Sequence, residues 1–179
     1  MKKRFLGLAL VLTAFAANAQ TQGTVTLNVK LKPLQTIMIQ GSTTVNLDYT
    51  DKNHYAQGVK AAIDNHLKVY STGGFEIYVR SADDTKTDGT NSINFNDITV
   101  EAANGSSELS DAPTYKTVNL ATAANSADNM LVKSEVGGVD KTFKVTYSAP
   151  NADKYILDGS VGTTEKTYTT TVTYEIVAS

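Results

Sequence analysis

The sequence of 179 residues contains no cysteine. Extracellular domains often depend on disulfides, so a cysteine-free domain outside the cell must be held together by its buried apolar area. The same absence leaves no cysteine for a lipid anchor. Only three prolines interrupt the chain, and long Gly/Ser tracts are missing. We therefore expect no linker and no second domain.

Basic residues are also scarce, since 16 Lys and Arg stand against 18 Asp and Glu. Beyond residue 19 the only arginine is Arg80. A protein that neutralises phosphates needs clustered Lys and Arg, so we expect no nucleic-acid partner. A membrane-spanning helix needs about 20 consecutive apolar residues, and the chain has no run of that length. We expect no membrane insertion.

The longest apolar run lies at the N-terminus and has the form of a secretory signal. Lys2, Lys3 and Arg4 precede the apolar residues 5–17, and Ala17-Asn18-Ala19 supplies a small-x-small cleavage pattern. This order is typical of a signal peptide. We expect residues 1–19 to be removed and 20–179 to form one mature domain beginning at Gln20. Export would place that domain outside the cell, on its surface or in the periplasm of a Gram-negative bacterium.

Groups that carry catalysis are few. His54 and His66 are the only histidines, neither has zinc-site spacing, and we expect both at the surface. Ser160, between Gly159 and Gly162, misses the G-x-S-x-G nucleophile pattern by one position. We predict no enzyme and no cofactor.

Three aspartates, Asp83, Asp84 and Asp88, suggest a calcium loop. In EF-hand numbering from Asp84, however, Lys86 occupies a ligand position, and Phe95 stands where a bidentate Glu is required. A looser calcium site and a solvated polar turn remain the alternatives.

The chain is rich in Thr, with 25 residues, and in Tyr, with nine. Both residue types favour a half-buried strand surface. Strict alternation is the main signal, and it begins at residues 24–32. Apolar side chains at alternate positions would form one face there, and Lys30 and Lys32 belong to the other. The apolar positions are Val25, Leu27, Val29 and Leu31.

Further alternating runs follow at a spacing of about ten residues. Gly73-Gly74 divides residues 67–69 from 75–79, and Gly137-Gly138 divides 130–134 from 141–147. Each pair is typical of a β-hairpin. Tyr70 and Tyr78 would then be neighbours on the outer face of the first hairpin, as a sugar-stacking surface or as an ordinary cross-strand pair. Residues 51–66 suit either a short helix or a loop with an extended piece.

The pattern ends with its longest alternation, residues 168–176, in which Tyr168, Val172, Tyr174 and Ile176 share one face. Many short strands, each apolar on one face, predict an antiparallel all-β sandwich. We expect an inward-facing core that comprises Phe75, Ile77, Val79, Phe143, Val145, Val172, Tyr174 and Ile176.

The two terminal strands carry a family resemblance. Residues 168–176, with the sequence Tyr-Thr-Thr-Thr-Val-Thr-Tyr-Glu-Ile, resemble the closing strand of pilin-like and spore-coat-U-like sandwich proteins. Residues 24–31 are similar to the N-terminal strand of those proteins, and the signal and the segment 65–75 are similar to those of small Bacteroidota surface proteins. The resemblance implies one immunoglobulin-like or pilin-like sandwich.

Two functions follow as expectations. The first is a secreted structural or adhesin-like cell-surface protein, such as a fimbrial (pilus-type) subunit that self-associates, or joins other surface subunits, through its terminal strands. Val25, Leu27, Val29 and Leu31 would be the donated residues. The alternative is a soluble extracytoplasmic module that binds a carbohydrate or cell-wall polymer, with Tyr70 and Tyr78 as its aromatic surface.

Overall fold

The computed structural model describes residues 22–88, 91–123, 126–157 and 164–179. The expected signal peptide and the turn around Ser160 lie outside these residues. The chain divides into two units, residues 1–31 and 32–179. Within the first unit the structure describes residues 22–31, which we call the arm.

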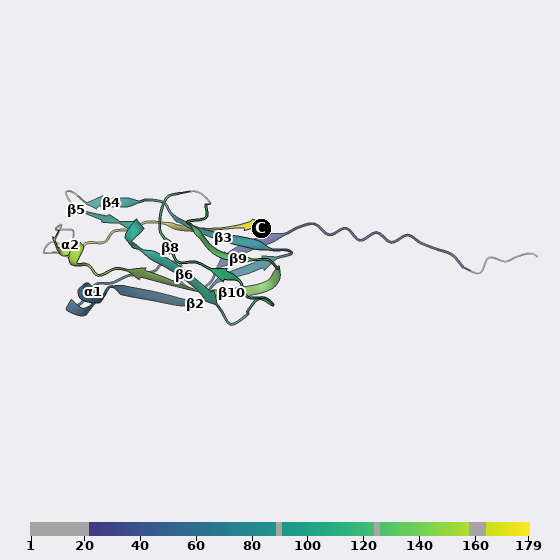
Figure 1. Cartoon of the computed structure of the whole chain (residues 1–179), viewed down its shortest axis with the longest axis horizontal. Helices are drawn as coiled ribbons and strands as arrows, with labels where there is room; N and C mark the ends of the chain where they lie inside the picture. Colours follow the sequence, from purple (N-terminus) through teal and green to yellow (C-terminus); the bar gives the residue numbers. More distant parts are fainter. Residues whose placement is uncertain (1–21, 89–90, 124–125, 158–163) are drawn as a thin grey trace, which may run out of the picture. The chain divides into compact units, whose positions relative to one another are not determined.

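The second unit is an all-β fold of antiparallel strands in two main sheets, as the alternation predicts (Figure 1). Sheet A has the order β1-β2-β10-β6-β8. Its strands are β1 (Gln35–Ile39), β2 (Val59–Ser71), β10 (Gly138–Ala149), β6 (Thr99–Asn104) and β8 (Val118–Asn119).

Sheet B has the order β11-β3-β9-β7. Its strands are β11 (Val172–Ala178), β3 (Phe75–Ser81), β9 (Met130–Ser134) and β7 (Thr114–Tyr115). A separate hairpin is formed by β4 (Thr85–Asp88) and β5 (Asn91–Asn94).

Three short helices complete the described structure. These are α1 (Lys52–Gln57), η1 (Phe95–Asp97, a 3₁₀ helix) and α2 (Asp153–Leu157). Helix α1 begins at the N-cap Asp51, whose side chain accepts the His54 N–H. It ends at Gly58, whose φ of 83° favours glycine. The segment 51–66 therefore contains a short helix at 52–57, and its later residues begin the long strand β2 instead of a helix or a loop.

The two sheets enclose one apolar core. Phe75 of β3 and Phe143 of β10 meet edge to face with ring centroids 6.3 Å apart. Of the predicted core, the five residues on β3 and β10 are fully buried. The three on β11, namely Val172, Tyr174 and Ile176, face the core but are only half-buried.

Both predicted Gly-Gly hairpins are wrong. Strand β2 pairs with β1 and β10, and β3 pairs with β11 and β9. Each Gly-Gly pair therefore carries the chain from one sheet to the other. The two corners pack together, since a Cβ on Gly137 would lie 2.3 Å from the Ser71 carbonyl oxygen and 2.7 Å from Gly73 N. Close backbone approach, and not a tight turn, explains why glycine is needed there.

The corners lie at one end of the sandwich together with the C-terminus, and α1 and α2 lie at the other end (Figure 1). We call these the corner end and the helix end. Strand β2 runs from the helix end to the corner end over 13 residues, a distance of about 40 Å.

Candidate functional site: the open edge

The arm carries four large apolar side chains in contact with water. Val25, Leu27, Val29 and Leu31 are 94%, 84%, 75% and 89% exposed. No strand is assigned to residues 22–34, although their alternation predicts one. Burying such a side chain contributes about 1.5–3 kcal/mol. The arm therefore has the pattern of a half-buried strand without a sheet of its own.

Strand β11 is an edge strand whose core-facing side is incompletely covered. Among the described residues it forms ladder hydrogen bonds with β3 only, and β1 packs against it without pairing. Its inward side chains are half-buried, and the half-buried pattern continues backward through Thr170 to Tyr168. The inward apolar side chains of the neighbouring strand β3, in contrast, have no exposed area. The core is closed beneath β3 and open beside β11.

A second open stretch lies at residues 45–49, where the chain has left sheet A after the end of β1. Val45, Leu47 and Tyr49 face the core and are half-buried, whereas Asn46 and Asp48 are exposed. Within the described residues, no backbone N–H or C=O from Val45 to Tyr49 has a hydrogen-bond partner. Buried backbone groups are nearly always paired. The unpaired N–H and C=O groups of this extended stretch could therefore form hydrogen bonds with an added strand.

Strand β1, which leads towards residues 45–49, lies beside β11 on one side of the sandwich. At the corner end, the Gln35 Nε2 and the Ser179 N–H both donate to the Gly74 carbonyl oxygen, each over 3.3 Å. A cavity of about 370 Å³ opens there between Leu34 and Gln35 on one side and Ala178 and Ser179 on the other. We call this side, made of β1, residues 45–49 and residues 168–178, the open edge.

A buried hydrogen-bond chain links the two rims of the open edge. His66 Nδ1 lies 3.1 Å from the Gln40 carbonyl oxygen, and Nε2 lies 3.2 Å from the Tyr147 hydroxyl. That hydroxyl is 2.6 Å from the hydroxyl of Tyr174 on β11. A carbonyl only accepts, so Nδ1 donates, Nε2 accepts from Tyr147, and Tyr174 donates to Tyr147. Burial raises the pKa of both tyrosines.

A bulge in β2 places His66 in this chain. Asn65 has a φ of 53°, and the pairing with β10 shifts between Phe143 and Val145. The two extra residues of β2 interrupt the side-chain alternation locally, so that His66 turns inward between the inward-facing Ile63 and Leu67. His66 is therefore 3% exposed, and the prediction that it lies at the surface is wrong. Sequence alternation alone cannot locate such a bulge.

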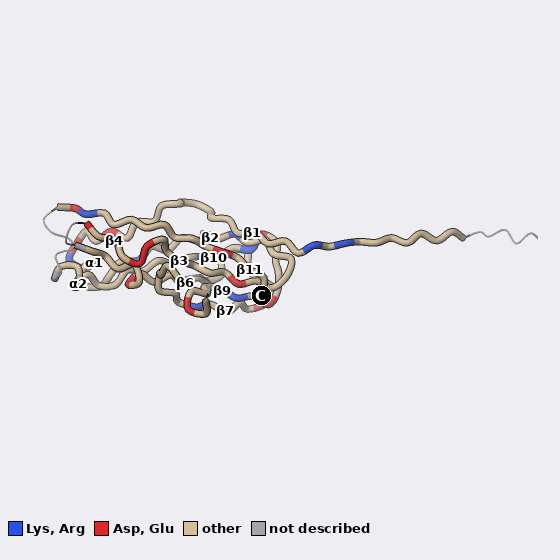
Figure 2. The backbone as a smooth tube through the Cα atoms, turned by 90° about the horizontal axis from the view of Figure 1, so that it is seen from above, with Lys and Arg blue, Asp and Glu red and all other residues tan. Residues whose placement is uncertain are grey.

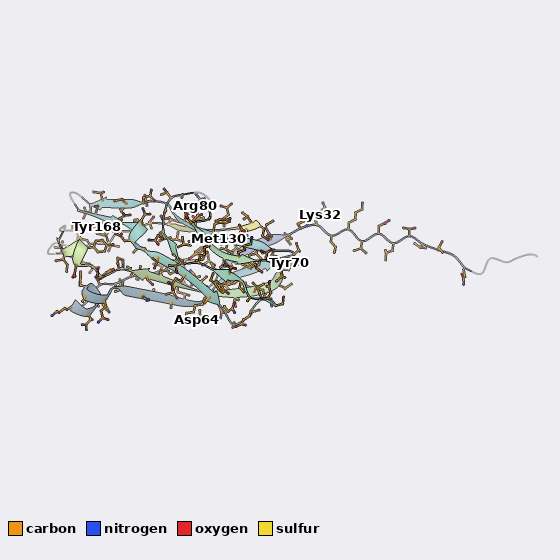
Figure 3. The ribbon with its side chains drawn as sticks, viewed as in Figure 1. Lys32, Asp64, Tyr70, Arg80, Met130 and Tyr168 are labelled. Atoms are coloured by element: carbon orange, nitrogen blue, oxygen red, sulfur yellow. The ribbon has the colours of Figure 1, made fainter. Side chains whose placement is uncertain are left out.

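The predicted aromatic surface is not formed as a pair. Tyr70 lies on β2 in sheet A and Tyr78 on β3 in sheet B, and Figure 3 shows Tyr70 near the corner end. The Tyr78 hydroxyl donates to Glu76 Oε2 over 2.5 Å. Cross-strand adjacency was expected from the hairpin, and it is lost because the chain changes sheets at Gly73-Gly74.

The three aspartates of the suggested calcium loop have separate partners. Asp83 accepts from Thr170 Oγ1, Asp84 accepts from the N–H and hydroxyl of Thr122, and Asp88 pairs with Lys166. Among the described residues, no group of three or more potential metal-ligating acids or histidines converges. In this structure the three carboxylates tie the β3–β4 region to neighbouring segments.

Charged residues are dispersed along the backbone, with Lys and Arg interspersed among Asp and Glu (Figure 2). No helix within the described residues is long and apolar enough to cross a membrane. No protein-family model and no curated protein matches the chain.

Proposed function

We propose that the protein is exported and serves as a structural, adhesin-like subunit of a cell-surface fibre. In this proposal the arm of one copy lies along the open edge of the next and completes its sandwich. The observation that carries the proposal is that the side-chain pattern of the arm matches that of the open edge in the same chain. Four exposed apolar residues alternate along the arm, and half-buried apolar residues alternate along the open edge.

The energetic terms support strand donation. An added strand would pair with β11 and the unpaired backbone of residues 45–49, and it would cover their half-buried side chains. The four arm side chains together would contribute about 6–12 kcal/mol of apolar burial, before the cost of ordering the arm. No catalytic step is part of this function.

Deletion of residues 22–31 from the mature protein tests the proposal. Because the core lies within residues 32–179, the deleted protein should fold but form no polymers by size-exclusion chromatography and electron microscopy. A peptide of residues 22–33 should bind it. Full-length protein that stays monomeric at every concentration would overturn the proposal.

A point variant separates the arm's two faces. Leu27→Asp should abolish polymers because it places a charge on the apolar face, and Asn28→Ala on the other face is the matched control. Equal polymer yields from the two variants would exclude apolar seating of the arm.

Export is tested independently of assembly. Intact-mass measurement of protein from the cell exterior or periplasm should find a chain that begins at Gln20. A main species that retains Met1 would contradict the proposed signal peptide.

A further inference from the structure

A cavity of about 430 Å³ lies between residues 46–48 and the start of β2, near the helix end. Residues 46–48 form one rim, residues 58–60 form the other, and His54 of α1 also lines the cavity. Within the described residues β1 pairs with β2 only from Leu67 onward, so residues 59–65 have no neighbouring strand on this side. The gap opens because the chain has left sheet A, and its volume lies in the usual range of small-molecule sites.

The two rims carry opposite charges. Asp48 lies on the first rim and Lys60 on the second, and both side chains are exposed. Within the described residues neither has a hydrogen-bond or ion-pair partner, whereas Lys144 and Asp64, elsewhere on sheet A, pair over 3.2 Å. Asp48 and Lys60 thus line one cavity without reaching each other. A ligand with an ammonium and a carboxylate group would bridge them through charge-assisted hydrogen bonds.

Neutral groups complete the lining of the cavity. The Nδ1 of His54 accepts the Thr50 N–H over 3.2 Å, so the imidazole carries its proton on Nε2 and offers a donor there. Leu47 is half-buried and Val59 is buried, and together they supply apolar contact. The unpaired backbone of residues 45–49 adds further donors and acceptors.

We infer that this cavity binds a short peptide with free ends, whose carboxylate contacts Lys60 and the His54 Nε2–H and whose ammonium contacts Asp48. Each peptide group of such a ligand carries one donor and one acceptor, which suit the unpaired backbone of residues 45–49. A free amino acid has the two charges but no peptide group. A neutral carbohydrate has neither charge, and no tyrosine or phenylalanine lines the cavity to stack on a sugar ring. The site goes beyond the proposed function and does not depend on it.

Amide NMR of mature full-length protein tests the site, with L-alanyl-L-alanine as the probe. The protein carries Leu27→Asp, so that no arm of a neighbouring copy competes for residues 45–49. Millimolar dipeptide should shift the amide signals of residues 46–48 and 58–60 until they saturate. The dipeptide with acetylated and amidated ends should bind at least about tenfold more weakly, because it lacks both charges. Free alanine should also bind more weakly, because it has no peptide group.

Two variants assign the ends of the ligand. Asp48→Asn should weaken binding about tenfold and should reduce the effect of acetylating the ligand's N-terminus. Lys60→Met should weaken binding similarly and should reduce the effect of amidating the C-terminus. Both residues are exposed, so the fold should be retained. Asp64→Asn and Lys144→Met, which remove charges outside the cavity, are the matched controls and should leave binding unchanged.

Three results would overturn the inference. The first is equal binding of the free and the blocked dipeptide, since the opposite charges would then play no part. The second is a response of the same amide signals to glucose and not to the dipeptide, which would assign the cavity to a carbohydrate. The third is the absence of a saturable shift at millimolar dipeptide. None of these results bears on the proposed function, which is tested by the polymers of the full-length protein.

Discussion

Phe143 occupies the centre of the core, where it is 1% exposed and contacts both Phe75 and Tyr115. Phe143→Ala should lower the free energy of unfolding by about 3–5 kcal/mol, because truncation leaves a cavity. Thr171→Ala, at an exposed position before β11, should change it little. Urea denaturation of the two variants measures the difference, and similar midpoints would contradict the assigned faces.

The buried chain from His66 to Tyr174 predicts unequal effects of removing two hydroxyls. Tyr147→Phe leaves the buried His66 Nε2 without a donor, which should cost about 1–3 kcal/mol. Tyr174→Phe removes only the terminal donor, and Tyr147 still has His66 as its acceptor. Its cost should be about 0.5–1.5 kcal/mol. Thermal denaturation ranks the variants, and the reverse order would show that the donor directions are wrong.

Glu76 is an acidic residue that the fold keeps ionised. The Tyr78 hydroxyl and then the Lys133 ammonium, 3.1 Å from Oε1, lower the pKa of this carboxyl. Its stabilising contribution is therefore complete above the unfolded pKa, about 4.3, and is lost as the pH falls through the folded value. Tyr78→Phe should raise the pKa of Glu76 in an NMR titration. Tyr70→Phe, on the other sheet, should leave it unchanged.

At this scale the sequence predicted side-chain faces well and bonding partners poorly. The buried faces of β3 and β10 follow directly from period-two alternation. His66 was misplaced because a bulge interrupts the alternation locally, and at this bulge Asn65 Oδ1 accepts hydrogen bonds from Ser106 and Thr142. Those contacts join residues far apart in the chain and leave no local pattern.

Among the elements, the two glycine corners predict a contrast between neighbouring sites. A Cβ on Gly137 would overlap backbone atoms of Ser71 and Gly73, whereas a Cβ on Gly73 would meet nothing within 4 Å. Gly137→Ala should therefore destabilise the protein by about 1–3 kcal/mol, as overpacking does, and Gly73→Ala should have a small effect. Denaturation midpoints test this, and equal losses would argue against the stacked corners.

The corners also show why element order could be predicted but pairing could not. The alternating run 130–134 coincides with β9, and the runs 67–69, 75–79 and 141–147 lie within β2, β3 and β10, but β2 begins eight residues before its run. A glycine pair that permits a hairpin also permits close packing between two sheet crossings, and single-sequence patterns do not distinguish them. The sequence predicted only part of the open edge. Alternation marks residues 45–49 and 168–171 as strands, but it does not show that a neighbouring strand is missing.

At the scale of the whole molecule, the arm should be the first part to be cleaved. Trypsin cuts after lysine but not before proline, so Lys32-Pro33 resists and Lys30 is the exposed site in the arm. Brief digestion of the monomer should give a stable fragment that begins at Leu31, because exposed terminal segments are cleaved before paired strands. Mass spectrometry identifies the cut. Assembled protein should lose this site, and early cleavage within β10 would contradict the described core.

The far edges of both sheets end in β7 and β8, strands of only two residues each. Such short strands offer almost no ladder for lateral pairing. With one acceptor edge and one arm, each subunit would be divalent, and growth would lengthen chains without branching or gelation. Mean length would then depend on concentration, as in step-growth polymerisation. A copy that lacks the arm would act as a chain terminator, so its molar fraction would set fibre length.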